Sequence, residues 1–521
     1  MNVADFKKIY LEEYEKLNTQ QKRAVETVEG PVMVIAGPGT GKTQILSRRV
    51  ANIMINHYTN PEEIVCLTYT EAGASEMLDR LEGLIGEEGR KVRVSTIHSF
   101  CSELILENPD LFGRQPKVIS TAVKYELLKE IMDKYITENS SLYKNRGDRY
   151  SSKDQLLELF SMMKRQGLNK ADIEKKIEDC KGEKKYQRLL DGVSIVEKYS
   201  EKIQEHNYFD FDDMILWTIK KLKEDGDFQK SVSNSIKYLF VDEFQDTSVI
   251  QNKLVDLLVE GKEELNIFVV GDDDQSIYRF QGVSADNIQV FDDKYQPTKI
   301  VLEENYRSSQ AIIDASRQLI SHNQREEKVL VAAGSNKDYD CQLPILKSYP
   351  NAEAEMFGVL NEIKELIQSG VSPQEIGVIY GRNSYGVEFA KILRDNGIFV
   401  QMKEEKNLFK DPFFKKLFTI LKYICQASRD VREVRKIAYF DFFDVEVSEI
   451  AKIRNLKKNE KITIPSIAEI DKKLETIRKK VDRSEKYLSP MYVLSDILKT
   501  LGIDEYIMKS KEKYHLVSVL N

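Results

Sequence analysis

Two short segments, each directly after a run of four apolar residues, most constrain what this chain can fold into. Ala36–Thr43 reads AGPGTGKT and follows Val32–Ile35. Asp242–Asp246 reads DEFQD and follows Tyr238–Val241. A buried strand, a glycine-rich turn and a helix N-terminus, in this order, form a loop whose backbone N–H groups surround phosphate oxygens. The pattern therefore predicts an α/β fold with a parallel sheet and a P-loop phosphate site.

The first segment has the residue types that phosphate binding needs. Its three glycines let the backbone approach phosphate oxygens closely. We expect the Lys42 ammonium to reach the β- and γ-phosphates and the Thr43 hydroxyl to bind Mg²⁺. The predicted nucleotide-binding residues of this loop are Ala36, Gly37, Pro38, Gly39, Thr40, Gly41, Lys42 and Thr43.

The second segment supplies two adjacent carboxylates at the tip of a predicted strand. Asp242 can hold Mg²⁺ opposite Thr43, directly or through water. Glu243 can orient and deprotonate the water that attacks the γ-phosphate. Two adjacent acids can also form a solvated loop, but their place after a buried strand favours a metal ligand and a base.

Gln275 and Arg307 also follow apolar runs. Gln275 can hydrogen-bond the γ-phosphate or the attacking water, and the acid triplet before it can equally be an ordinary turn. Arg307 can neutralise charge that develops on the transferred phosphoryl group, and Tyr306 can stack on adenine. The alternative for Arg307 is a surface ion pair with a neighbouring glutamate. Catalytic roles are predicted for Glu243, Gln275 and Arg307.

Composition limits the remaining choices. A chain of 521 residues suggests three or four domains. The net charge of −7 argues only weakly against nucleic acid, because a basic groove can lie on an acidic protein. The five cysteines include no Cys-x-x-Cys pair, which favours reduced thiols in a cytoplasmic protein. We find no apolar run near the ~20 residues that span a bilayer and no signal peptide, so we expect no membrane partner.

The order and spacing of these segments resemble those of superfamily 1 DNA helicases of the UvrD/Rep/PcrA type. The resemblance covers roughly residues 17–425. The matching segments are Leu17–Gln21, Ala36–Thr43, Thr68–Ala72, Thr96–Phe100, Phe209–Asp213, Asp242–Asp246 with Gln251, Val270–Val283, Leu302–Ser308 and Ile376–Glu388.

The resemblance implies RecA-like parallel sheet domains with helical insertions. The first motor domain, 1A, would comprise residues 1–108 and 206–330, with a helical insertion, 1B, at 109–205. Residues 331–427 would begin the second motor domain, 2A, and residues 428–521 would be part of the helical accessory domain 2B.

The same resemblance implies an ATP- and Mg²⁺-dependent motor on single-stranded DNA and on single-strand/double-strand junctions, moving 3′ to 5′ in repair or recombination. Gln21 would read adenine. The implied DNA-binding residues are Tyr69, Thr96, His98 and Phe280, of which Tyr69 and Phe280 offer aromatic faces for base stacking.

Departures from the family pattern are also informative. The segment Phe280–Val283 reads FQGV rather than WRGA, a form that resembles helicases coupled to nucleases. Two C-terminal family motifs, one with a second arginine finger, are not found. We therefore expect the chain to end inside the accessory domain, as a truncated motor would.

Three functions follow as alternatives: a helicase or single-strand translocase, the motor part of a helicase–nuclease complex, and an ATP-controlled DNA clamp that does not translocate. The presence of Glu243, Gln275 and Arg307 argues against the clamp. A GTPase is disfavoured because no Asn-Lys-x-Asp guanine-reading segment is found.

Overall fold

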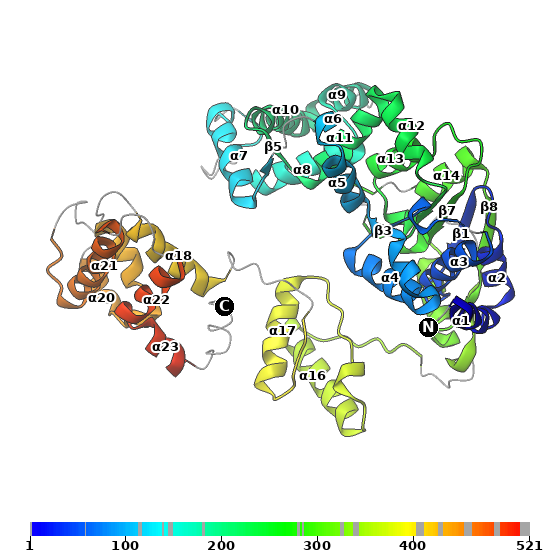
Figure 1. Ribbon diagram of the computed structural model, residues 1–521. Coiled ribbons are helices and arrows are strands. Elements are labelled where there is room, and N and C mark those ends of the chain that lie inside the picture. Colours follow the sequence, from blue (N-terminus) through cyan, green and yellow to red (C-terminus); the bar gives the residue numbers. More distant parts are fainter. Residues whose placement is uncertain are drawn as a thin grey trace. The chain divides into compact units, whose positions relative to one another are not determined.

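The computed structural model describes residues 3–57, 59–112, 117–137, 140–143, 150–179, 183–278, 282–283, 286–322, 328–336, 343–402, 411–425, 431–452, 461–483 and 490–510. The chain divides into two units, residues 1–346 and residues 347–521, and each is described by itself (Figure 1). Within the described ranges, every helix is too short or too polar to cross a membrane.

A parallel six-stranded sheet forms the centre of the first unit. Its strand order is β3-β2-β6-β7-β1-β8. The strands are β1 (Val32–Ala36), β2 (Ile64–Thr68), β3 (Arg93–Thr96), β6 (Tyr238–Val241), β7 (Ile267–Gly271) and β8 (Thr298–Leu302). The α/β fold with a parallel sheet, predicted from the sequence, is confirmed.

Helices cover both faces of this sheet, which explains why its central strands are apolar at every position. Along β1, Val32 and Val34 face one core while Met33 and Ile35 face the other. The first core also contains side chains of α2 (Thr19–Glu26), α3 (Lys42–Asn56) and α4 (Glu71–Ile85). The second contains those of α5 (Ile97–Glu107), α11 (Phe211–Glu224), α12 (Gly226–Asn234), α13 (Val249–Val259) and α14 (Asn287–Tyr295).

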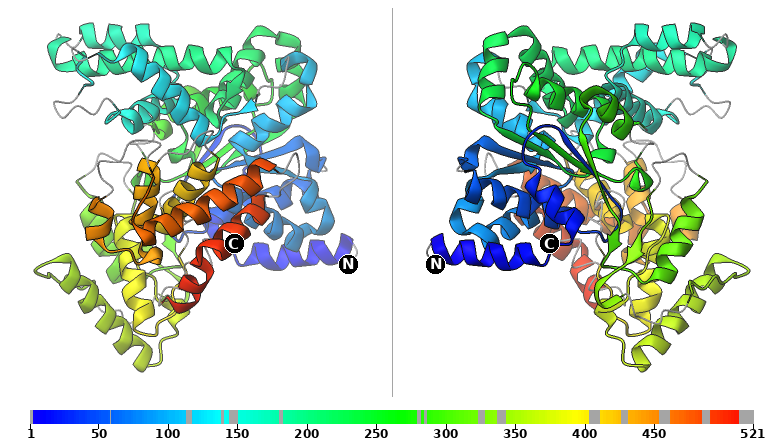
Figure 2. Two further views of the ribbon diagram at one scale, coloured as in Figure 1. Left: turned by 90° about the vertical axis from the view of Figure 1, so that its left-hand side faces the viewer. Right: turned by 90° about the vertical axis from the view of Figure 1, so that its right-hand side faces the viewer.

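A mainly helical region between α5 and α11 has a core of its own, which includes Leu128, Phe160 and Tyr199. Its elements are α6 (Pro109–Phe112), β4 (Lys117–Val118), α7 (Thr121–Tyr135), α8 (Lys153–Gln166), α9 (Lys170–Asp179), α10 (Glu183–Glu205) and β5 (Tyr208–Phe209). Figures 1 and 2 show this region, coloured cyan to teal, at one end of the first unit and α1 (Val3–Glu15) at the opposite end.

The segment after β8 forms a separate two-stranded sheet. Here β9 (Glu304–Asn305) pairs with β10 (Val331–Ala332), and α15 (Gln310–Ile320) lies between them in the sequence. Short 3-10 turns complete the unit: η1 (Pro61–Glu63), η2 (Gly86–Lys91), η3 (Phe244–Asp246), η4 (Asp273–Gln275) and η6 (Gly334–Asn336).

The second unit is helical in its described residues, and its helices form two separate cores. Its elements are α16 (Ala352–Gln368), η7 (Pro373–Glu375), α17 (Asn383–Asp395), α18 (Pro412–Ile424), α19 (Val431–Ala438), η9 (Asp441–Phe443), α20 (Val447–Lys452), α21 (Pro465–Arg483), α22 (Pro490–Leu501) and α23 (Ile503–Lys509).

The apolar run Ile376–Tyr380 forms no strand, although the sequence placed it in an α/β stretch. Ile379 is 100% exposed, so burial does not stabilise this segment as a core strand. A strand also needs a hydrogen-bonding neighbour, and the described residues of this unit supply none. The assignment of residues 331–427 to a second RecA-like domain, like the other domain boundaries, stays a prediction.

Candidate nucleotide and nucleic-acid site

Three adjacent parallel strands, β6, β7 and β1, bring the candidate residues to one edge of the sheet. The carboxyl end of β1 leads into the P-loop, that of β6 into Asp242, and that of β7 into Asp272. Ligands of open parallel sheets bind at this edge, so these three loops can act on one substrate.

The P-loop has the backbone shape of a phosphate-binding turn. Gly39 and Gly41 have φ values of 72° and 91°, in the left-handed region that glycine adopts without strain. The buried Thr40 hydroxyl donates to the Gly37 carbonyl over 2.8 Å. Gly41 begins α3 without a side-chain cap, so the first N–H groups of α3 can bind an anion.

Neighbouring segments hold three consecutive P-loop carbonyls. Asn305 Nδ2 donates to the Pro38 carbonyl over 2.6 Å, and the Tyr306 N–H donates to the Gly39 carbonyl over 2.9 Å. Gln21 Nε2 donates to the Thr40 carbonyl over 2.9 Å. Because these carbonyls are bound from outside, the loop N–H groups remain available to phosphate oxygens.

We predict that Asn305→Ala lowers the free energy of unfolding by about 1–3 kcal/mol, the cost of leaving buried partners unsatisfied. Asn305 is 1% exposed, and its Oδ1 also accepts the backbone N–H groups of Arg307 and Ser308. Denaturant unfolding measures the loss, and titration with a fluorescent ATP analogue measures the accompanying loss of affinity.

Asn305→Asp is the matched control for this prediction. It keeps an acceptor for the two N–H groups but sets a carboxylate oxygen against the Pro38 carbonyl, so nucleotide affinity should fall more than stability does. Equal stability and affinity in Asn305→Ala and the unsubstituted protein would show that Asn305 does not order the loop.

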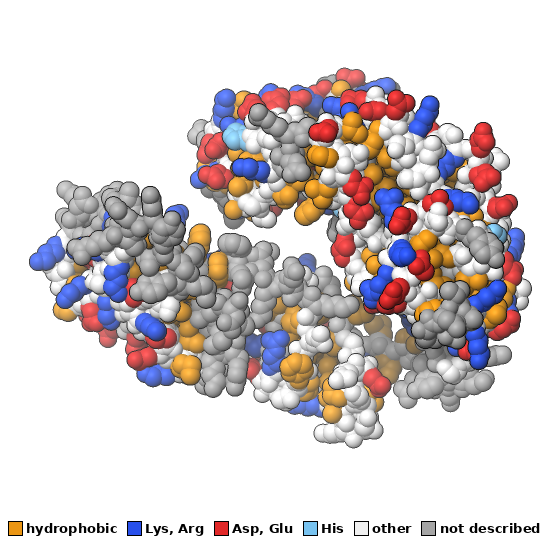
Figure 3. Space-filling view, in the orientation of Figure 1, with side chains coloured by type: hydrophobic (Ala, Val, Ile, Leu, Met, Phe, Trp, Pro, Cys, Tyr) orange, Lys and Arg blue, Asp and Glu red, His pale blue; other side chains and the backbone are white. Residues whose placement is uncertain are grey.

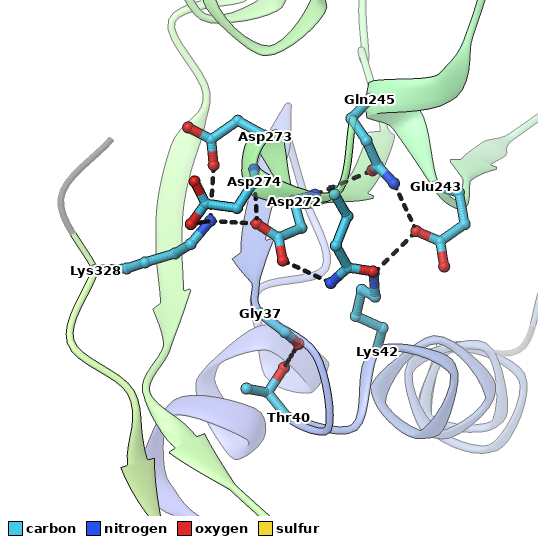
Figure 4. A network of polar contacts seen from close by, with 10 residues as sticks. Gly37, Thr40, Lys42, Glu243, Gln245, Asp272, Asp273, Asp274 and Lys328 are labelled. Carbon is cyan, nitrogen blue, oxygen red and sulfur yellow. Dashed lines mark hydrogen bonds and ion pairs between the residues drawn. The ribbon is translucent and has the colours of Figure 1, made fainter. Parts of the chain in front are cut away.

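Lys42 joins the P-loop to both other strand ends. Its Nζ donates to Glu243 Oε2 over 2.9 Å and to Gln275 Oε1 over 3.2 Å (Figure 4). Gln245 Nε2 donates to the same Glu243 oxygen over 2.9 Å, and Gln245 Oε1 accepts the Asp272 N–H over 3.0 Å. The predicted lysine is thus within hydrogen-bond distance of both the predicted base, Glu243, and the predicted glutamine, Gln275.

Glu243 has an unusual backbone conformation for a residue with a side chain. Its φ is 48°, in the left-handed region, where non-glycine residues are strained. Such strain costs of order 1–3 kcal/mol and is found at functional sites, where the surrounding structure enforces it. Here the turn η3 follows Glu243 directly and aims its carboxylate at Lys42.

The two aspartates that flank this glutamate have altered proton affinities. Burial raises the pKa of Asp242 to about 7, and the neighbouring Glu243 carboxylate adds to the effect. Burial and Glu243 also raise the pKa of Asp246 to about 6. A half-buried carboxylate with a half-buried threonine hydroxyl is an oxygen donor set that suits Mg²⁺, so Asp242 and Thr43 fit the predicted metal site.

Tyr306 and Arg307 lie beside the P-loop, as their place after β8 predicted. The Tyr306 hydroxyl donates to Glu304 over 2.6 Å and accepts from Asn18 Nδ2 over 3.0 Å. A Cβ built on Gly39 would lie 2.5 Å from the Arg307 Cβ, so the base of the Arg307 side chain packs against the P-loop. The Arg307 residue itself is exposed. Adenine contact by Gln21 and Tyr306, and the arginine-finger role, stay predictions.

A second site adjoins Asp242 and Asp246. A cavity of about 250 Å³ is lined by these two aspartates and by the predicted DNA-binding residues Tyr69, Thr96 and His98. The Tyr69 ring stacks on Tyr278 with 5.6 Å between centroids. Thr96 is buried and donates to Glu71 over 2.7 Å, so its hydroxyl has a structural partner. Phe280 lies outside the described residues.

Several residues of these sites were not assigned from the sequence. Phe211 is 64% exposed and meets His98 edge-on, with 6.3 Å between ring centroids. Tyr278, Gln245 and Phe211 lie in segments that the sequence singled out, and an aromatic or amide inside such a segment was the available signal. Asn305 and Asp272 also lie in such segments, whereas Lys328, discussed below, lies outside them and gave no signal.

A family model decides the relationship of this chain to known proteins. The model of the UvrD/REP helicase N-terminal domain matches residues 17–296, and that of the UvrD-like helicase C-terminal domain matches residues 300–475. This chain belongs to the UvrD/REP helicase family. The family resemblance inferred from the sequence motifs is confirmed.

Relatives in the UvrD/REP family include two staphylococcal proteins. The chain is 29% identical over 419 residues to the ATP-dependent DNA helicase PcrA of Staphylococcus epidermidis and 27% identical over 419 residues to that of Staphylococcus aureus. Each alignment covers 80% of this chain and 54% of the relative. The chain therefore spans about half the length of these relatives.

Proposed function

We propose that this chain supplies the ATP-hydrolysing site of a helicase that moves along single-stranded DNA in the 3′ to 5′ direction. The observation that carries the proposal is the position of Lys42 Nζ, within hydrogen-bond distance of both Glu243 and Gln275. Membership of the UvrD/REP family and similarity to PcrA support DNA as the substrate. Nuclease coupling and a truncated chain stay predictions.

The site residues have separable tasks in ATP hydrolysis. Lys42 and the first N–H groups of α3 bind the phosphates, and Lys42 neutralises charge that develops on them. Glu243 accepts the proton of the attacking water. Arg307 approaches from β9 and adds positive charge. Magnesium, when bound by Thr43 and Asp242, would supply further charge neutralisation on the phosphate oxygens.

The orientation of Gln275 follows from its partners. Its Nε2 donates to Asp272 Oδ2 over 2.6 Å, and an ionised carboxylate can only accept hydrogen bonds. Its Oε1 therefore faces Lys42, which can only donate. A hydrogen-bond acceptor beside Lys42 suits a proton of the attacking water better than a phosphate oxygen, so we assign Gln275 to positioning that water.

The cavity beside Tyr69 gives the DNA part of the proposal a physical basis. Exposed aromatic faces bind successive bases without regard to sequence. Tyr69 and Phe211 are exposed, and the cavity wall includes Asp242 and Asp246 of the ATP site. A base bound there would contact Asp242 and Asp246, which lie directly before Glu243 and in the η3 turn that follows it, and this contact would couple DNA binding to hydrolysis. On the face of residues 1–346 seen in Figure 3, basic and acidic side chains are mixed.

We predict that Tyr69→Ala weakens single-stranded DNA binding by about 1–3 kcal/mol, the contribution of one base–aromatic stack. Binding as a whole should weaken steeply with salt, because phosphate contacts release counterions. The salt slope of Tyr69→Ala should equal that of the unsubstituted protein, because stacking is not ionic. Fluorescence anisotropy with a labelled oligonucleotide measures both quantities.

Tyr135→Ala is the control for this titration. Tyr135 is 41% exposed, like Tyr69 at 38%, but lies in α7 and does not line the cavity. Equal losses of DNA affinity in Tyr69→Ala and Tyr135→Ala would show that the cavity is not where the DNA binds.

Strand separation with tailed duplexes tests the direction of movement. With ATP and Mg²⁺, the protein should separate a duplex with a 3′ single-stranded tail and leave one with a 5′ tail intact. Separation of the 5′-tailed duplex alone would contradict the proposed direction. Failure with both duplexes, together with ATP hydrolysis, would favour a clamp that does not translocate.

A further inference from the structure

Lys328 is a buried lysine that lies among three consecutive carboxylates. Its side chain is 2% exposed, and Figure 4 shows its ammonium beside Asp272, Asp273 and Asp274. Its Nζ lies 2.7 Å from Asp273 Oδ1 and 3.0 Å from Asp274 Oδ2, and it also donates to Asp272 Oδ1. Oxygens of the three carboxylates lie within 4.8 Å of one another, and the ammonium acts as their shared cation.

This cluster needs its cation. Asp272 is fully buried, and a buried charge without a partner is costly. Burial alone lowers the pKa of Lys328, but the Asp272 and Asp273 carboxylates outweigh burial and hold it above the usual lysine value. Lys328 therefore stays charged at neutral pH.

Asp272 connects this cluster to the ATP site. One of its oxygens accepts from Lys328, and the other accepts from Gln275 Nε2 over 2.6 Å. Because Lys328 holds one oxygen of Asp272 while the other accepts the Gln275 amide, the orientation of Gln275 depends on the contact between Lys328 and Asp272. Lys328 itself lies outside the strand ends that form the site, three residues before β10 (Val331–Ala332).

We propose that Lys328 is a positioning residue for ATP hydrolysis, acting through Asp272 to direct Gln275 Oε1 toward Lys42 and the attacking water. The inference rests on the proposed ATPase function and names a residue beyond the family motifs quoted above. The alternative is that Lys328 stabilises the fold and has no specific effect on the reaction.

A double-mutant cycle between Lys328→Met and Gln275→Ala separates these alternatives. Each single variant should lower kcat by about 10²-fold, the loss expected when a reacting group is displaced by about an ångström. The KM for ATP should change little, because neither residue holds the bulk of the nucleotide. If Lys328 acts through Gln275, the double variant should be no slower than the slower single variant. Multiplied losses would overturn the proposal.

The ratio of affinities for fluorescent ATP and ADP analogues gives a second readout that does not need turnover. Because Gln275 contacts Lys42, the residue proposed to bind the γ-phosphate, Lys328→Met and Gln275→Ala should shift this ratio by the same factor. The double variant should shift it no further. An unchanged ratio in Lys328→Met beside a changed ratio in Gln275→Ala would also overturn the proposal.

Control variants make each outcome interpretable. Lys299→Met removes a lysine of β8 whose partner, Asp292, lies 2.6 Å away at the surface, and it should keep the kcat of the unsubstituted protein. Lys328→Arg, which preserves the charge, should be much faster than Lys328→Met. If Lys328→Met fails to bind the ADP analogue, the triple variant Lys328→Met/Asp273→Asn/Asp274→Asn replaces it. It keeps Asp272 to hold Gln275 but removes two of the three carboxylates that Lys328 neutralises, so less negative charge is left without a partner.

Failure of this inference and failure of the proposed function give different results. No ATP hydrolysis and no ATP binding by the unsubstituted protein would reject the proposed function itself. Hydrolysis that falls in Gln275→Ala but not in Lys328→Met would reject only the role of Lys328.

Discussion

Lys42→Ala should reduce Mg-ATP affinity by about 100-fold or more and abolish turnover. Hydrogen bonds to charged groups contribute about 1.5–3 kcal/mol each, and the Lys42 ammonium is placed to make several with phosphate oxygens. The substitution also removes the ammonium that holds Glu243 and Gln275 together. Titration with a fluorescent ATP analogue and steady-state phosphate release measure the two effects.

Lys220→Ala serves as the matched control, because the Lys220 side chain is 71% exposed on α11 and pairs only loosely with Glu224, at 3.8 Å. It should bind and hydrolyse ATP like the unsubstituted protein. Unchanged affinity and hydrolysis in Lys42→Ala would contradict the assignment of Ala36–Thr43 as the phosphate-binding loop.

Glu243→Gln should keep Mg-ATP bound while lowering turnover by about 10²–10⁴-fold, the usual contribution of a general base. The glutamine amide has the shape of the carboxylate and can still accept a hydrogen bond from Lys42, but it cannot take a proton. The left-handed backbone at this position, φ 48°, strains glutamine as much as glutamate, so the substitution should not change the backbone. ATP-analogue binding and phosphate release, measured on one preparation, test the two parts together.

Asp246→Asn is the informative comparison for the base. Burial and the Glu243 carboxylate raise the pKa of Asp246 to about 6, which would also suit a general base near neutral pH. Asp246, however, lines the cavity with Tyr69, whereas Glu243 contacts Lys42. Retained hydrolysis in Glu243→Gln together with lost hydrolysis in Asp246→Asn would transfer the base role to Asp246.

Local sequence was sufficient to predict the parts of the site that lie at strand ends. An apolar run followed by glycines or acids places Lys42 and Asp242 at the carboxyl edge of a parallel sheet, whatever the rest of the chain does. The parallel pairing of β1 and β7 then brings Gln275 within 3.2 Å of Lys42. The order of these segments along the chain is sufficient to predict that they meet, because parallel strands with crossover connections allow few topologies.

Contacts between distant segments could not be predicted in this way. Asn305 and Lys328 act through partners 267 and 56 residues away, respectively, so their roles depend on packing that no local pattern records. A lysine in a charged stretch normally indicates a solvated surface. The run Ile376–Tyr380 shows the opposite error, in which a local pattern predicts too much. Its apolar residues suit a strand, but the described residues give it no neighbouring strand.

The most direct test of the account is phosphate release by the protein with Mg-ATP, measured with and without a single-stranded oligonucleotide. If the cavity beside Tyr69 binds bases and shares Asp242 with the ATP site, DNA should raise the rate, and Tyr69→Ala should need more DNA to reach the same stimulation. ATP hydrolysis with the same rate at every DNA concentration, under conditions where the oligonucleotide is bound, would contradict a DNA-coupled motor.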